Sequence, residues 1–168
     1  SPVDRHRAGV EDGPLHATEV GDAVHRLLER LDLARPEAPA AAELELLVRR
    51  WYPHVATGEL ERIRELVCAY TGSRLAERIA GLTGARPERP FAFELDGVVL
   101  NGRLDVLWRE PGRALVLDYK TNSLLGRDPR EIVEEEYRTQ RTVYALACLR
   151  GGATEVEVLY QFLEAPEA

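Results

Sequence analysis

The sequence has no methionine, two cysteines and a single lysine in 168 residues. Cys68 and Cys148 lie far apart, with no second cysteine or histidine at metal-binding spacing, which excludes zinc-finger and disulfide scaffolds. Both occur in helix-like segments, so we expect core thiols of a reduced, intracellular protein. The missing methionine, also at position 1, leads us to expect a piece of a longer polypeptide.

Long apolar runs are also missing. None approaches the roughly 20 residues that cross a bilayer, and the first residues lack the pattern of a secretory signal, so we expect no membrane partner. The formal net charge is −7, which argues against tight independent binding of nucleic acid, because that affinity comes mainly from Lys and Arg. The charge does not exclude a nuclease whose substrate is delivered by another domain or protein.

Length and a hydrophobic content of 45% suffice for one domain over residues 1–168. Residues 1–17 predict an irregular lead-in, and Thr18 is a plausible N-cap for a helix to about Leu33. His25 lies on the flank of its apolar stripe, with Gly21 one turn earlier, which we expect to leave the imidazole uncovered. Taken alone, such a histidine is more often a structural boundary residue. Three further amphipathic helices predict a helical insertion over residues 40–80.

From residue 88 the hydrophobic period changes to two, and the dipeptide Asp96-Gly97 predicts a β-hairpin. A second turn at Pro111-Gly112 leads into a third antiparallel strand, so Asp105 and Asp118 lie on neighbouring strands. Residues 128–149 predict a helix broken near Glu136, and residues 156–162 a last strand. The pattern predicts an α/β fold with a mixed central sheet flanked by helices.

The third strand, residues 115–121, runs from three apolar residues into Asp118, Tyr119 and Lys120. Side chains alternate along a strand, so Asp118 and Lys120 share one side and Tyr119 takes the other. Lys120 is the only lysine, whereas the other 21 basic residues are arginine. Because a lysine ammonium can lose its proton and approach a water molecule, which a guanidinium cannot do, we expect Lys120 to have a chemical role.

Two carboxylates, a lysine and a histidine in this arrangement predict a divalent-metal site. Mg²⁺ and Mn²⁺ prefer oxygen ligands and accept one imidazole, and a metal-bound water beside Lys120 suits hydrolysis of phosphodiesters. Gln140 and Tyr144 are four residues apart on the last helix and therefore share one face.

These residues resemble the PD-(D/E)xK nucleases, in particular the RecB-type nuclease module of bacterial helicase-nucleases such as AddA and UvrD-like enzymes. The resemblance rests on four blocks in the family's order. They are residues 21–29, residues 102–105 preceded by 88–91, residues 118–121, and the Gln-x-x-x-Tyr of residues 140–144.

The resemblance implies a restriction-endonuclease-like fold and a role for each matched residue. The implied metal ligands are His25, Asp105, Asp118 and the backbone carbonyl of Tyr119, and the implied catalytic residues are Asp105, Asp118 and Lys120. Gln140, Tyr144, Arg103 and Thr121 are expected to support the site or contact DNA.

It further implies Mg²⁺ as cofactor, with Mn²⁺ as a substitute, and DNA as substrate, single-stranded DNA being favoured. The resemblance also implies helicase domains N-terminal to this module in the same polypeptide, and a partner helicase-nuclease subunit. It implies exonuclease action in double-strand break repair in the bacterial cytoplasm.

Related AddB and CRISPR-adaptation nucleases carry four cysteines around an iron–sulfur cluster, three of them after the Gln-x-x-x-Tyr helix. Here Cys148 stands alone in that region, so we expect no cluster. Two rival hypotheses remain, a catalytically silent DNA-binding or scaffolding module of a helicase and a free-standing nuclease. Filled metal and lysine positions argue against the first, and the acidic charge and absent methionine against the second.

Overall fold

The computed structural model describes residues 15–168, so most of the predicted lead-in lies outside the described residues. The elements follow one another as α1 (Ala17–Glu29), α2 (Ala41–Trp51), α3 (Thr57–Thr71), α4 (Arg74–Ala80), β1 (Arg86–Leu95), β2 (Val98–Glu110), β3 (Arg113–Lys120), α5 (Pro129–Glu136), α6 (Arg138–Arg150) and β4 (Glu155–Phe162). Within this range, no helix combines the length and apolar character that a membrane crossing requires.

The four strands form one mixed sheet, as the sequence predicts, and their order is β1-β2-β3-β4. The first three strands make an antiparallel meander, and β4 returns parallel to β3 after α5 and α6. Asp96 and Gly97 both have positive φ angles, 49° and 78°, which a type I′ hairpin turn requires. The architecture is α/β and consistent with a restriction-endonuclease-like domain.

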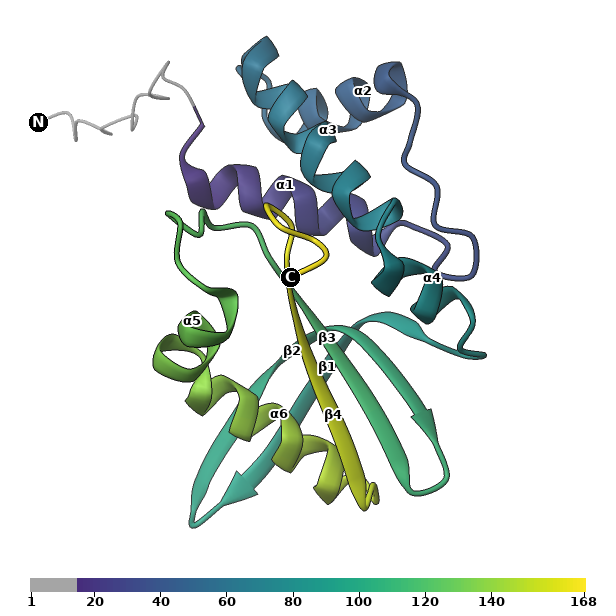
Figure 1. The fold of residues 1–168 in the computed structure, drawn as a ribbon, viewed down its shortest axis with the longest axis vertical. Coiled ribbons are helices and arrows are strands. Elements are labelled where there is room, and N and C mark those ends of the chain that lie inside the picture. The colour runs from purple at the N-terminus through teal and green to yellow at the C-terminus, as the bar shows by residue number, and fades with distance from the viewer. Residues whose placement is uncertain (1–14) are drawn as a thin grey trace, which may run out of the picture.

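Helices cover both faces of the sheet, and β3 is buried between them (Figure 1). Helices α1 to α4 pack on one face against Val106, Leu115, Leu117 and Tyr119. Helix α6 covers the other face, where Tyr144 and Cys148 pack against residues of β2 and β3. The alternation of β3 therefore points Tyr119 towards α1 and α3, and Asp118 and Lys120 towards α5 and α6.

Strand β2 changes its packing at Asp105. Leu104 packs on the α6 side and Val106 on the α1 side, although residues two apart on a regular strand share a face. Opposite Asp105, Glu88 has a φ angle of 43° and interrupts the pairing of β1 with β2. Asp105 therefore lies where the alternation of side chains breaks, between His25 of α1 and the end of β3.

The first helix differs from its prediction at both ends. It begins at Ala17, because the Glu19 carboxylate accepts a hydrogen bond from the His16 backbone N–H at 2.8 Å and fixes the start there. The helix ends at Glu29 and not near Leu33. Around residues 32–34 the chain forms a turn, in which the Asp32 carboxylate accepts a hydrogen bond from the Ala34 N–H. Cys68 is exposed, so the expectation of two core thiols is wrong for one of them.

Candidate active site

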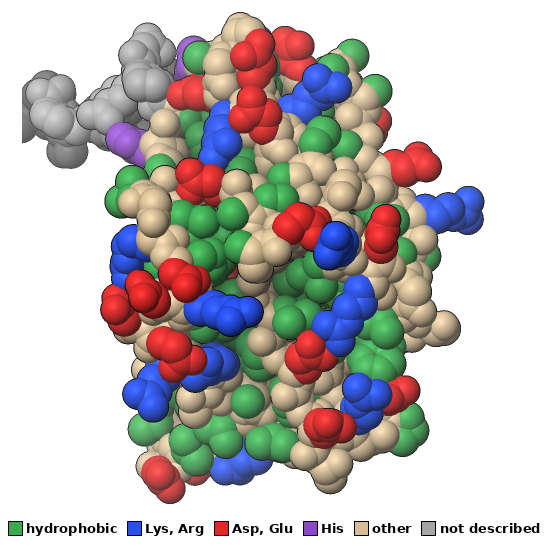
Figure 2. Space-filling model, in the orientation of Figure 1, with side chains coloured by type: hydrophobic (Ala, Val, Ile, Leu, Met, Phe, Trp, Pro, Cys, Tyr) green, Lys and Arg blue, Asp and Glu red, His purple; other side chains and the backbone are tan. Residues whose placement is uncertain are grey.

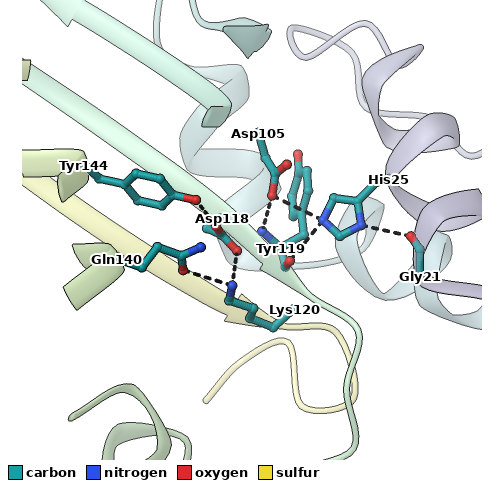
Figure 3. A network of polar contacts seen from close by, with 8 residues as sticks. All are labelled: Gly21, His25, Asp105, Asp118, Tyr119, Lys120, Gln140 and Tyr144. Atoms are coloured by element: carbon teal, nitrogen blue, oxygen red, sulfur yellow. Dashed lines mark hydrogen bonds and ion pairs between the residues drawn. The ribbon is translucent and has the colours of Figure 1, made fainter. Parts of the chain in front are cut away.

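An open cavity of about 790 Å³ lies at the carboxyl end of β3. Helix α1 forms one wall, and the residues that follow β3 form another, with Tyr137 and Tyr144 contributed by the α5–α6 region. All the side chains singled out in the sequence line this cavity except Gln140, which reaches it through Lys120. Figure 3 shows six of them, from α1, β2, β3 and α6, converging: His25, Asp105, Asp118, Lys120, Gln140 and Tyr144.

Asp118 and Lys120 are held by one polar network on the α6 side. Lys120 Nζ lies 2.9 Å from Asp118 Oδ1 and donates a hydrogen bond to Gln140 Oε1 at 3.0 Å. The Tyr144 hydroxyl donates to Asp118 Oδ2 at 2.6 Å (Figure 3). Gln140 and Tyr144, one helical turn apart on α6, thus fix the lysine and the carboxylate respectively.

His25 meets Asp105 on the other side of the cavity. Its Nε2 lies 3.3 Å from Asp105 Oδ2 and 3.1 Å from the Tyr119 carbonyl oxygen. Its Nδ1 lies 2.9 Å from the carbonyl oxygen of Gly21, one turn earlier on α1, and the Tyr119 N–H donates to Asp105 Oδ2 at 2.7 Å. The break in β2 lets Asp105 reach both the helix and the end of β3.

The electrostatics of the two sides differ. Burial lowers the pKa of His25, but the hydrogen bond and negative charge of Asp105 outweigh it and raise that pKa to about 9. Burial raises the pKa of Asp118, and the Lys120 ammonium works against this rise. In the metal-free protein, positively charged His25 and Lys120 therefore offset the two neighbouring carboxylates.

The donor atoms suit a divalent ion in their chemistry, because Mg²⁺ and Mn²⁺ prefer oxygen ligands and accept an imidazole. His25 Nε2 lies 3.1 Å from the Tyr119 carbonyl oxygen and 3.3 Å from Asp105 Oδ2, so these donors are already neighbours. Both oxygens of Asp118 face Lys120 and Tyr144. Over residues 15–168 no three His, Cys, Asp or Glu side chains form a ready-made cluster, so a metal would require His25 to lose a proton and Asp118 to adjust.

Gly21 has a different role from the one expected. A Cβ atom there would lie 2.7 Å from the hydroxyl oxygen of Thr121, not over the imidazole of His25. Glycine at this position therefore lets α1 approach the residue that follows Lys120. That approach brings His25 to the Tyr119 carbonyl.

Arg103 lines the cavity, but its guanidinium is paired with Glu88. Glu88 is also hydrogen-bonded to Glu29, which raises the pKa of Glu29 and lowers that of Glu88. Both glutamates lie within the blocks that carry the resemblance, residues 21–29 and 88–91, but no role was assigned to either of them. Their spacings were further signals, because Glu29 follows His25 by one helical turn and Glu88 lies opposite Asp105 in the hairpin.

Two tyrosines beside Lys120 were also missed. The ammonium lies 4.1 Å from the centre of the Tyr137 ring and 5.4 Å from that of Tyr160. Tyr160 pairs with Asp118 in the parallel register of β4 with β3. The contact of Lys120 with Tyr160 depends on the register of a strand about 40 residues away, so no local sequence pattern predicts it.

Known proteins resemble this chain over most of its length. A family model described as the PD-(D/E)XK nuclease superfamily matches residues 3–168. An ATP-dependent helicase/nuclease subunit from Bacillus cereus is 24% identical over 174 residues, and one from Enterococcus faecalis is 26% identical over 165 residues. Both alignments cover 88% of this chain, and the chain spans 14% and 13% of those relatives. The match over nearly the whole chain, together with the site at the end of β3, makes this chain a member of the PD-(D/E)XK nuclease superfamily.

Proposed function

We propose that the chain is a Mg²⁺-dependent deoxyribonuclease, with Mn²⁺ as a substitute, that degrades single strands as an exonuclease. The proposal includes helicase domains in the same polypeptide that deliver the strand, a partner helicase-nuclease subunit, and a role in double-strand break repair and recombination. Membership of a nuclease superfamily and the printed names of the relatives, helicase/nuclease subunits, support it.

One observation carries the proposal. His25 Nε2 lies 3.3 Å from Asp105 Oδ2 and 3.1 Å from the Tyr119 carbonyl oxygen, beside the ion pair of Asp118 with Lys120. Oxygen and imidazole donors next to an enclosed ammonium are what metal-assisted hydrolysis of a phosphodiester needs. A module that only binds DNA has no use for this combination.

In the proposed reaction water adds to phosphorus, the bond to one ester oxygen breaks, and the leaving oxygen takes up a proton from solvent to become a hydroxyl group. A bound Mg²⁺ supplies a lowered pKa for coordinated water and offsets negative charge on the phosphate. His25, Asp105, Asp118 and the Tyr119 carbonyl would hold the ion. Lys120 would orient the attacking water as an ammonium, or would accept the proton of the water after first giving up its own proton to solvent. Gln140 holds the lysine side chain in place by its hydrogen bond.

The charges around the cavity support delivery of the strand by another domain. Arg103 is paired with Glu88, and Arg141 with Glu134, so both guanidinium groups are already neutralised within the chain. Few phosphates can be attracted over a long range by a chain of net charge −7. Tight independent capture of DNA is therefore not part of the proposal.

The test is cleavage of end-labelled single- and double-stranded DNA with Mg²⁺, with Mn²⁺ and with excess chelator. We expect metal-dependent loss of the single strand from its end, and none of it in Asp118→Asn, which keeps the shape of the side chain but loses the negative charge. Asp128→Asn is the matched control, because Asp128 caps α5 away from the cavity and asparagine caps equally well. If the chain binds DNA but does not cleave it with either metal ion, the rival hypothesis of a catalytically silent DNA-binding module is correct instead.

A further inference from the structure

We propose that Tyr137 is a positioning residue for Lys120, its ring forming a wall that holds the ammonium in the reactive place. This inference deepens the proposed function and rests on it for its kinetic consequences. It stands on the geometry of the corner between α5 and α6.

Tyr137 is fixed by its backbone on both sides. It ends α5 and precedes α6, with φ −113° and ψ 8°, so the helix axis breaks at this residue. Its N–H donates to the Val133 carbonyl at 3.1 Å, and its own carbonyl accepts from the Arg141 N–H at 2.9 Å. The break is thus a hydrogen-bonded corner, and it turns the Tyr137 side chain into the cavity.

The ring is supported from behind by two aromatic residues of β4. It stacks on Tyr160 at 5.6 Å between ring centres with an angle of 19°, and it lies 6.5 Å from Phe162. Ile132, Leu124 and Phe162 form the small core beneath this group. A ring packed in this way has little freedom to move away from its neighbour.

Lys120 uses this wall as the third side of its enclosure. Two of the three ammonium donors point to oxygen atoms, those of Asp118 and Gln140. The Tyr137 ring, 4.1 Å from Nζ, closes a further side, where the negative face of an aromatic ring attracts a cation. Since the four-carbon stem of lysine is flexible, the ring limits where the remaining N–H can point.

The ring, not the hydroxyl, is the proposed determinant, which gives a matched pair of variants. In Tyr137→Leu an apolar side chain remains but the aromatic face is lost; in Tyr137→Phe the face is kept. We expect kcat to fall about 10- to 100-fold in the leucine variant, the scale of a small misplacement of a reacting group, with KM little changed. The phenylalanine variant should keep kcat within about threefold of the parent.

The single lysine of the chain provides a readout that does not need turnover. Labelling with ¹³C,¹⁵N-lysine gives side-chain resonances from Lys120 alone, and the protons next to Nζ should be shifted upfield by the ring current of Tyr137. We expect this shift to be retained in Tyr137→Phe and lost in Tyr137→Leu. Phe93→Leu, an aromatic substitution on β1 against Phe91, should leave both the resonances and kcat unchanged.

The outcomes separate this inference from the proposed function. If the parent does not cleave DNA, the proposed function fails, and the lysine resonances still decide whether Tyr137 positions Lys120. Equal lysine spectra in the parent and in Tyr137→Leu would overturn the inference. A kcat of Tyr137→Leu within about threefold of that of the parent would overturn it as well. A phenylalanine variant as impaired as the leucine variant would overturn it too, since the hydroxyl would then be responsible.

Discussion

Lys120 is the residue at which composition and geometry coincide. It is the only lysine, and its side chain is 13% exposed between a carboxylate, an amide oxygen and an aromatic ring. The other 21 basic residues are arginine. The fork of a guanidinium is too large and too planar for the enclosure around Lys120.

We therefore expect Lys120→Arg to lower the rate of turnover by about 10²-fold or more, the usual contribution of acid–base catalysis. Charge near the phosphate would be retained, whereas the group that orients or deprotonates water would be displaced. The measurement is single-turnover cleavage at saturating Mg²⁺, with the metal-induced melting shift as the control for metal binding, because Lys120 is not a proposed ligand. A variant within about threefold of the parent would show that only its charge matters.

His25 is the residue whose contacts a metal would change most. We expect millimolar Mg²⁺ or Mn²⁺ to raise the melting temperature of the parent, since a ligand that binds only the folded state stabilises it. His25→Ala should shrink this shift, because one donor of the set is gone. Melting curves with and without chelator give the result, and a parent whose melting temperature no divalent ion changes would rule out the proposed ligand set.

At the scale of elements, local patterns predicted what depends on local geometry. Alternation along β3 placed Asp118 beside Lys120, and the turn at Pro111-Gly112 set the register that brings Asp105 next to β3. The break of the helix near Glu136 was also predicted, and the structure has it at Tyr137. The aromatic wall was not, because it depends on how β4 aligns with β3 across a long connection.

The contact between α1 and the end of β3 was equally hidden from local pattern. The sequence showed a glycine one turn before a histidine, which suggested room for the imidazole. The actual neighbour, Thr121, lies 100 residues further along the chain. Only the packed arrangement of α1 on the sheet decides which side chain occupies that space.

Gly21→Ala tests this contact directly. Alanine is favoured over glycine inside a helix by about 1 kcal/mol, so an uncrowded position should gain stability. At residue 21 the new Cβ would lie 2.7 Å from the Thr121 hydroxyl, and we expect a net loss of about 1 to 3 kcal/mol in unfolding free energy.

Denaturant unfolding of Gly21→Ala and Gly58→Ala provides the comparison. Gly58 is also helical, but nothing lies within 4 Å of its added Cβ, so that variant should be neutral or slightly more stable. Adding Thr121→Ala to Gly21→Ala should recover most of the loss. If Gly21→Ala is as stable as the parent, α1 does not depend on this close approach.

At the scale of the whole molecule, acidic groups balance most of the arginines near the cavity. Arg26 is paired with Asp22, Arg62 with Glu65 and Arg103 with Glu88. These exposed ion pairs contribute little to stability, but they leave few guanidinium groups available for phosphates. The space-filling view shows acidic and basic side chains interspersed over the face drawn there, without a continuous basic track (Figure 2).

We expect this chain by itself to bind a short single strand with a dissociation constant weaker than about 10⁻⁶ M at physiological salt, the range of non-specific binding. Fluorescence anisotropy of a labelled strand over a series of salt concentrations measures both the affinity and the number of phosphates neutralised. The Asp118→Asn variant, which we expect not to cleave DNA, allows the measurement with Mg²⁺ present. Sub-micromolar binding would contradict the idea that another domain delivers the strand.

The solitary lysine also makes the bond from Lys120 to Thr121 the one place where a lysine-specific protease can cut this chain. In the folded state the side chain that such a protease must engage is enclosed at the end of β3. Nicking would separate residues 1–120 from residues 121–168, which include α5, α6 and β4. The rate of that single cut therefore reports how often the corner around Lys120 opens, independently of any substrate or metal.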